Sequence, residues 1–225
     1  MSDTSRTPGD GDDSRTQDDG DTGRGTETGL DAGDEAALDD VPDWEDEYLD
    51  RVSDRLLHNY DLEKDRVVEG ERFTLYGRME LHSQKHFFHP ALSFAHHESF
   101  EHLFVRRMDR VDVPALERFV DLGHRLAEDW IEPNEEHFCT EFTFVAVVPT
   151  ITESVGDHVA GFRDRTMLKM GYNGHYEVNL LVVAPDEEEL VASENADVAV
   201  AFRLWEQIER EEPGILGLIA RRLQL

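Results

Sequence analysis

Cysteine is almost absent from this chain, and other hallmarks of familiar protein classes are missing. Cys139 is the only cysteine, so no disulfide can form within the chain and no cysteine cluster can hold zinc. No run of 18 apolar residues occurs, and the first 20 residues lack the apolar centre of a signal peptide. We therefore expect a cytoplasmic protein that does not span a membrane.

The signature motifs of common enzymes are also missing. There is no Walker A loop, no Gly-x-Gly-x-x-Gly after a strand and no Gly-x-Ser-x-Gly. The Glu-x-Lys pair of restriction-type nucleases is incomplete, because Asn179 stands where the lysine belongs. Cys139 begins an apolar run, which favours a buried thiol over a nucleophile. The sequence alone therefore identifies no reaction.

Positive charge is scarce. The chain has 51 acidic residues against 22 Lys and Arg, only three of them lysine, and its net charge is -29. Residues 1–42 contribute -10 and the remainder -19, so the folded part is itself acidic. Such charge repels itself in dilute buffer, whereas about 1 M salt shortens the screening length to roughly 3 Å. Nucleic acid is an unlikely partner, because non-specific binding needs clustered Lys and Arg.

This composition resembles that of proteins from salt-in halophiles, notably haloarchaea. The core resembles an uncharacterised protein family found in those organisms. The resemblance implies a cytoplasm near saturating salt, and it implies no activity. An ordinary acidic protein is the alternative, and the three lysines favour the halophile.

Two regions differ in composition. Residues 1–42 are rich in Asp, Gly, Ser and Thr and have almost no large apolar side chains. They cannot bury enough surface to offset their chain entropy, so we predict a disordered acidic tail. Residues 43–225 carry periodic apolar patterns and are predicted to form a single domain.

Apolar periodicity predicts the elements of that domain. Helices are expected at 43–60, with Asp43 as N-cap, and at 114–130 and 152–165. Strands are expected at 72–84, 98–107 and 141–148, and a hairpin at 167–184 turns at Asn173–Gly174. A helix or a broken pair of helices at 187–210 and a short helix after Pro213–Gly214 end the chain.

This order predicts an α+β fold. One mixed sheet of about five strands, formed by two hairpins and a central strand, would be covered by helices on at least one face.

Polar residues alternate with apolar residues on three of these strands. They are Arg78, Glu80 and His82 on the first, Glu141 and Thr143 on the central strand, and His175, Glu177 and Asn179 on the last. If these faces coincide, two histidines and three glutamates converge. They would bind a divalent metal or act as an acid and a base. The alternative is the solvent face of a half-covered sheet, where such residues are ordinary.

Six of the 11 histidines lie between residues 82 and 102. Their spacing matches neither zinc fingers nor His-Glu-x-x-His, so a surface segment remains the alternative to a metal site.

Two functional hypotheses follow. The first is a binding protein without enzymatic activity, which contacts a protein partner or a second copy through its sheet edge or the aromatic loop 86–100. The second is a metal-dependent hydrolase or nuclease. In it Glu80, Glu141 and Glu177 would be catalytic, and His82 and His175 would bind metal. The oligomeric state is left open.

Overall fold

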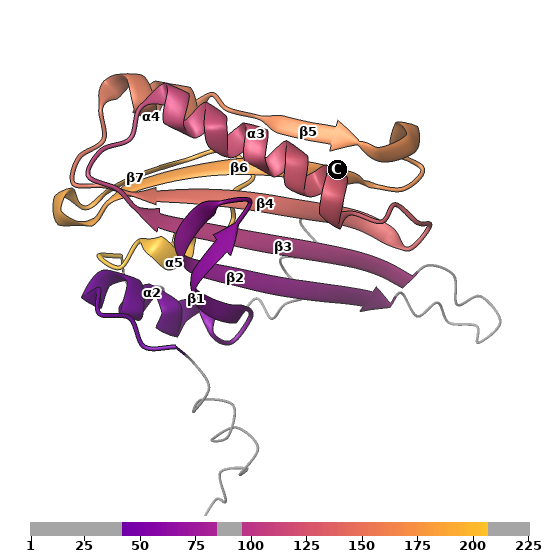
Figure 1. Cartoon of the computed structure of the whole chain (residues 1–225), viewed down its shortest axis with the longest axis horizontal. Coiled ribbons are helices and arrows are strands. Elements are labelled where there is room, and N and C mark those ends of the chain that lie inside the picture. Colours follow the sequence, from indigo (N-terminus) through magenta and orange to yellow (C-terminus); the bar gives the residue numbers. More distant parts are fainter. Residues whose placement is uncertain (1–41, 85–95, 207–225) are drawn as a thin grey trace, which may run out of the picture. The chain divides into compact units, whose positions relative to one another are not determined.

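The computed structural model describes residues 42–84 and 96–206, with side chains for 42–81 and 98–206. The described residues form one seven-stranded sheet and four α-helices (Figure 1). The strands are β1 Asp61–Val68, β2 Glu71–Gln84, β3 His96–Arg107, β4 His137–Val147, β5 Asp164–Met167, β6 His175–Ala184 and β7 Glu189–Ala192. The helices are α2 Glu47–Leu56, α3 Val113–Trp130, α4 Glu153–Ala160 and α5 Ala199–Phe202. The α+β prediction is thus confirmed in its class.

The sheet is mixed and runs in the order β1-β2-β3-β4-β6. Strands β1, β2 and β3 are antiparallel neighbours, whereas β3, β4 and β6 are parallel. Strands β5 and β7 pair antiparallel with opposite halves of β6. Parallel neighbours need crossover connections, which here contain α3 and α4.

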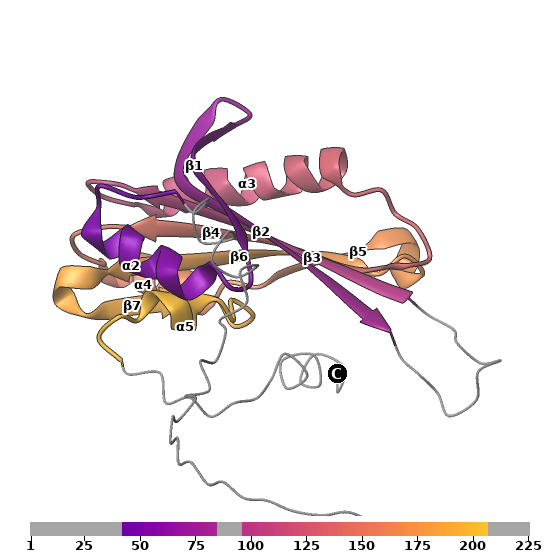
Figure 2. The same ribbon diagram turned by 90° about the horizontal axis from the view of Figure 1, so that it is seen from below.

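Helices cover both faces of the sheet. Helices α3 and α4 pack on one face, which we call the α3 face, around Phe104, Phe144 and Leu180. Helices α2 and α5 pack on the other, the α2 face, around Val105, Val145 and Leu181 (Figure 2). None of the helices in the described part of the chain combines the length and apolar character that a membrane crossing requires.

Helix α3 follows from its sequence. The Asp112 side chain caps it by accepting a 2.9 Å hydrogen bond from the Ala115 amide, and Pro114 suits the first turn. Its buried stripe includes Leu116, Phe119, Leu122 and Leu126, as expected for a helix with one apolar face. The helix ends at Trp130, and this placement brings the indole against His102 of β3 and Phe142 of β4.

Strand β2 changes the face it presents. Phe73 packs in the α3 core and Leu75 in the α2 core, although strict alternation would put both on one face. At this point the β1–β2 ladder has no pair between Asp65 and Thr74, and Asp65 has a φ of 56°. The single continuous alternation predicted for 72–84 is therefore wrong here.

Other predictions also need correction. Strands β1 and β7 were not predicted, and the helix expected at 187–210 is replaced by β7 and the short α5. Asp46, not Asp43, caps α2, and α4 ends at Ala160. The tail predicted at 1–42 lies outside the described residues except for Pro42, and so do most of the aromatic loop predicted at 86–100 and the final predicted helix.

The hairpin at 167–184 forms, but its connection spans residues 168–174 instead of two residues. Gly174 has a φ of 72°, and an added Cβ would lie 2.2 Å from the carbonyl oxygen of Phe138. Glycine is therefore required where the chain enters β6.

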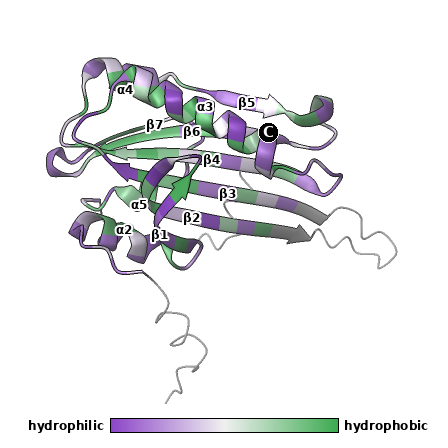
Figure 3. Cartoon of the chain, in the orientation of Figure 1, coloured by the Kyte–Doolittle hydropathy of each residue, from purple (hydrophilic) through white to green (hydrophobic). Residues whose placement is uncertain are grey.

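Polarity divides β4 and β6 along their length. Their carboxyl halves are largely apolar, whereas their amino halves carry the polar residues Glu141, His175 and Glu177 (Figure 3). The amino halves are therefore where polar chemistry is concentrated.

Candidate functional site

The five residues nominated from the sequence do not form one site. Glu141 and Glu177 are paired neighbours on β4 and β6, and His175 lies on the same face as Glu177. Glu141 is paired with Glu101 of β3, which is paired with Met79 of β2. Met79 therefore shares the face of Glu141, and Glu80, the next residue, points to the opposite face. The expected convergence with Glu80 is therefore wrong, because an offset of one residue in register reverses the face of a side chain.

The histidine-rich segment is described only in part. His82 lies on β2 opposite Glu98, but its side chain is outside the described residues. A metal role for His82 therefore remains a prediction. His102, at the end of the segment, is described and buried.

A row of three glutamates crosses the α2 face. Glu101, Glu141 and Glu177 are successive partners on β3, β4 and β6. Glu141 and Glu177 are buried, and Glu101 accepts a 2.6 Å hydrogen bond from the Tyr60 hydroxyl. The sequence analysis does not single out Glu101, although Glu101 alternates with Phe100 and His102 on its strand. Like charges on adjacent strands repel, so this row favours cations nearby.

Glu177 is held by three polar groups. Its Oε1 accepts hydrogen bonds from Arg165 at 2.6 Å and lies 3.2 Å from Nε2 of His175; its Oε2 accepts from Asn195 at 2.8 Å. Burial favours the neutral acid, but the bond to His175, the charge of Arg165 and the bond from Asn195 outweigh it. The pKa of Glu177 is therefore lowered, and the group is a carboxylate at neutral pH.

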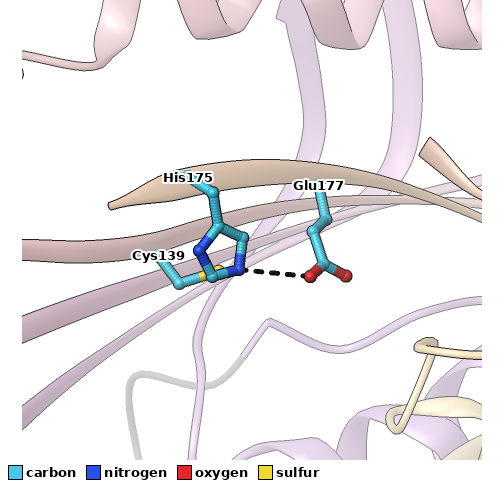
Figure 4. A group of neighbouring side chains, drawn as sticks. All are labelled: Cys139, His175 and Glu177. Carbon is cyan, nitrogen blue, oxygen red and sulfur yellow. Dashed lines mark ion pairs between the residues drawn. The ribbon is translucent and has the colours of Figure 1, made fainter. Parts of the chain in front are cut away.

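Cys139 completes a compact group with His175 and Glu177. One ligand atom from each residue lies within 4.8 Å of the other two (Figure 4). The group forms because Cys139 is paired with His175 across the parallel β4–β6 ladder. The thiol is buried, as the sequence predicted, but its polar neighbours were not anticipated.

A cavity of about 580 Å³ opens on the α3 face. Its walls come from β1, β2, β3, the end of α3 and the start of β4. The lining includes Arg66, Tyr76, Arg78, Phe100, His102 and Trp130. This volume falls in the range typical of small-molecule sites.

Two arginines face the cavity over aromatic rings. The Arg66 guanidinium lies 4.2 Å from the ring centre of Tyr76 and 5.9 Å from that of Trp130. The Arg78 guanidinium lies 5.9 Å from the ring centre of Phe100. Each arginine also pairs with a glutamate through one terminal nitrogen: Arg66 Nη1 with Glu63, and Arg78 Nη2 with Glu80. Their remaining N–H groups make no hydrogen bond to other described residues, so the fork of each guanidinium is only partly used.

His102 and Tyr76 form the floor of the cavity. The Tyr76 hydroxyl lies 2.8 Å from Nδ1 of His102, whose ring stacks on Phe142 and meets Trp130 edge-on. Burial, together with the charges of Arg78 and Arg66, lowers the pKa of His102 to about 4. Burial also raises the pKa of Tyr76 to about 12. Both groups are therefore neutral at pH 7.

His137 fixes the far wall. Its Nδ1 lies 2.8 Å from the Asn173 carbonyl oxygen, which can only accept, so Nδ1 carries the proton. Its Nε2 lies 2.8 Å from the hydroxyl oxygen of Thr140. Both nitrogens of the His137 ring are thus used in contacts within the protein.

The sequence did not reveal this cavity. Arg66 lies on a strand that the apolar pattern missed, and Trp130 was assigned to the buried stripe of a helix. Only the register of β2 against β3, which aligns Arg78 with His102, brings the groups together.

Comparison with known proteins gives one match. A family model described as Domain of unknown function (DUF8052) matches residues 45–204. Comparison with curated proteins and with solved structures gives no match.

Proposed function

The chain belongs to this DUF8052 family, and we propose that it is a binding protein whose cavity on the α3 face holds a small planar molecule with an anionic group. The observation that carries the proposal is the pair of guanidinium groups, Arg66 and Arg78, that face one cavity while lying over aromatic rings. The wider expectation of a protein partner stays a prediction.

The lining supports both parts of such a ligand. A planar ring suits the aromatic walls of Phe100 and Trp130, because offset stacking gains dispersion and buries apolar area. The anionic group suits the unused N–H groups of Arg66 and Arg78, which match carboxylate and phosphate oxygens. Salt screens attraction between charges but does not remove dispersion or apolar burial, so stacking would also operate in concentrated salt.

The charges that line the cavity restrict where the anionic group of the ligand can lie. Glu63, Glu98 and Glu132 also line the cavity and would repel an anion placed beside them. The anionic group must therefore lie between the two arginines, with the ring directed toward Trp130. This orientation is a testable consequence of the lining.

Equilibrium dialysis in molar salt with AMP, adenosine and inorganic phosphate tests the proposal. AMP joins a planar ring to an anion, so it should bind more tightly than either part alone. Replacing both Arg66 and Arg78 with Gln should weaken AMP binding about 10- to 100-fold, since a charge-assisted hydrogen bond contributes roughly 1.5–3 kcal/mol. The control is Arg163→Gln, which removes an exposed arginine elsewhere and should change nothing.

Two results would contradict the proposal. One is adenosine binding as tightly as AMP, and the other is AMP binding unchanged in the Arg66→Gln, Arg78→Gln protein. Circular dichroism of the variant protein must match the wild type for either comparison.

We also propose that the protein works in a cytoplasm of molar salt. The net charge of -29 supports this, since salt screens the repulsion among carboxylates.

A further inference from the structure

Four side chains of types that can bind metal ions occupy a two-by-two arrangement on the α2 face. Cys139 and Glu141 lie two residues apart on β4, and His175 and Glu177 lie two residues apart on β6. Cys139 is paired with His175 and Glu141 with Glu177. Residues two apart on one strand share a face, so all four side chains point to the same side. The cavity lies on the opposite face, so this group is separate from the proposed ligand site.

We propose that these four residues bind one divalent cation of the zinc class. Cys139, His175 and Glu177 are the preformed ligands, because their donor atoms already lie within 4.8 Å of one another. Glu141, the cross-strand neighbour of Glu177, supplies the fourth ligand and closes a tetrahedral site.

The donor set selects the metal. A thiolate and an imidazole together favour zinc and neighbouring transition metals, whereas magnesium and calcium prefer oxygen ligands alone. When the cation binds, the Cys139 thiol loses its proton to solvent and a sulfur–metal bond forms. Binding is therefore accompanied by release of one proton from the thiol.

Charge in this part of the sheet also favours a cation. Glu141 and Glu177 are buried and directly paired, and a dication between them would offset their mutual repulsion. All ligands come from two adjacent strands, so the cation would fasten the amino ends of β4 and β6. We assign it a stabilising role and no catalytic step.

Arg165 competes with the cation. Its guanidinium donates to Oε1 of Glu177 from Nε at 2.6 Å, and Nη2 of the same group lies 2.5 Å from that oxygen. The Arg165 side chain is 46% exposed, so it can move into solvent when a metal takes its place. The competition gives the proposal an unusual signature: removing Arg165 should tighten metal binding.

Titration of the full chain with Co²⁺ in molar salt tests the site. Tetrahedral cobalt bound to a thiolate gives a sulfur-to-metal charge-transfer absorption, and Cys139 is the only sulfur of this kind in the chain. The band therefore reports this site alone, whatever the histidines elsewhere bind. We expect it to saturate at one Co²⁺ per chain and to be displaced by Zn²⁺.

Variants sharpen the result. Cys139→Ser should abolish the band, His175→Gln should weaken Co²⁺ binding at least about tenfold, and Arg165→Gln should strengthen it several-fold. The matched control is His124→Gln, which alters a histidine that also contacts a carboxylate, Asp164, but has no cysteine beside it.

Absence of the charge-transfer band at saturating Co²⁺ in folded wild-type protein would overturn the proposal. So would equal or weaker binding by folded Arg165→Gln protein, because a cation that shares Glu177 must gain from losing its competitor. Neither result bears on AMP binding in the cavity on the other face.

Discussion

The hydroxyl of Tyr76 and Nδ1 of His102 lie 2.8 Å apart, in a buried contact between β2 and β3. The contact exists because the β2–β3 register places Tyr76 opposite Phe104 and His102 opposite Arg78, on one face of the sheet. A neutral imidazole can accept the phenolic hydrogen at Nδ1 and keep a proton on Nε2. Burial, together with the charges of Arg78 and Arg66, keeps His102 uncharged in the folded protein well below its ordinary pKa.

The first prediction is a pH-dependent loss of stability from His102. Its pKa is about 4 in the folded chain and 6.5 in the unfolded chain, so between these values only the unfolded chain binds the proton. The contribution of neutral His102 to the free energy of unfolding is fully present above about pH 6.5. It falls by roughly 1.4 kcal/mol per pH unit as the pH drops toward 4. Urea unfolding at about pH 7.5 and about pH 5.5 measures the change.

Carboxylates also titrate in this range, so the comparison must be between proteins. The His102→Gln variant keeps a hydrogen-bonding side chain but has no proton to gain. We expect wild type to lose about 1 kcal/mol more than this variant over the interval. Equal losses in both proteins would show that His102 is not held neutral.

The second prediction separates backbone strain from steric clash. Gly174 and Gly70 both have positive φ, 72° and 84°, but an added Cβ meets the Phe138 carbonyl oxygen only at Gly174. Gly70→Ala should cost about 1–2 kcal/mol, the strain of a left-handed residue. Gly174→Ala should cost clearly more, because the backbone at the start of β6 must also move.

Chemical denaturation of the two variants measures both costs under the same conditions. Equal losses in free energy of unfolding at the two positions would mean that the clash with the Phe138 carbonyl oxygen adds nothing to the cost of Gly174→Ala.

Particular elements show what the sequence could predict. Helix α3 was found almost to the residue, because its cap, its proline and its apolar stripe are all local signals. Strand β1 was missed because Asp61–Val68 is rich in charge and is interrupted by the positive φ of Asp65. Strand β7 was missed because its four residues are too short to show a period.

The candidate sites depend on register, which is not local. Alternation correctly places His175 and Glu177 on one face of β6. It does not show which side chains of β2 lie on that same face of the sheet. The switch between Phe73 and Leu75 carried Glu80 to the other side. The same register brought Arg78 to His102 and created a cavity that no pattern in the sequence indicated.

The third prediction concerns salt. With a net charge of -29, the folded chain should gain stability as potassium chloride rises from dilute buffer to about 3 M, where charge repulsion is screened. Far-UV circular dichroism and urea midpoints across the series measure the gain. A fully folded protein in salt-free buffer, with no further gain on adding salt, would contradict the proposed salt adaptation.

The most direct test of the binding proposal is an NMR titration of the tryptophan indole N–H signals with AMP. Trp130 lines the cavity, whereas Trp44 packs on the α2 face and donates its indole N–H to the Thr74 carbonyl at 2.9 Å. We predict that AMP shifts the Trp130 signal in a saturable way and leaves the Trp44 signal in place. A Trp130 signal that stays unmoved at saturating AMP, or one that shifts equally with adenosine, would contradict the account.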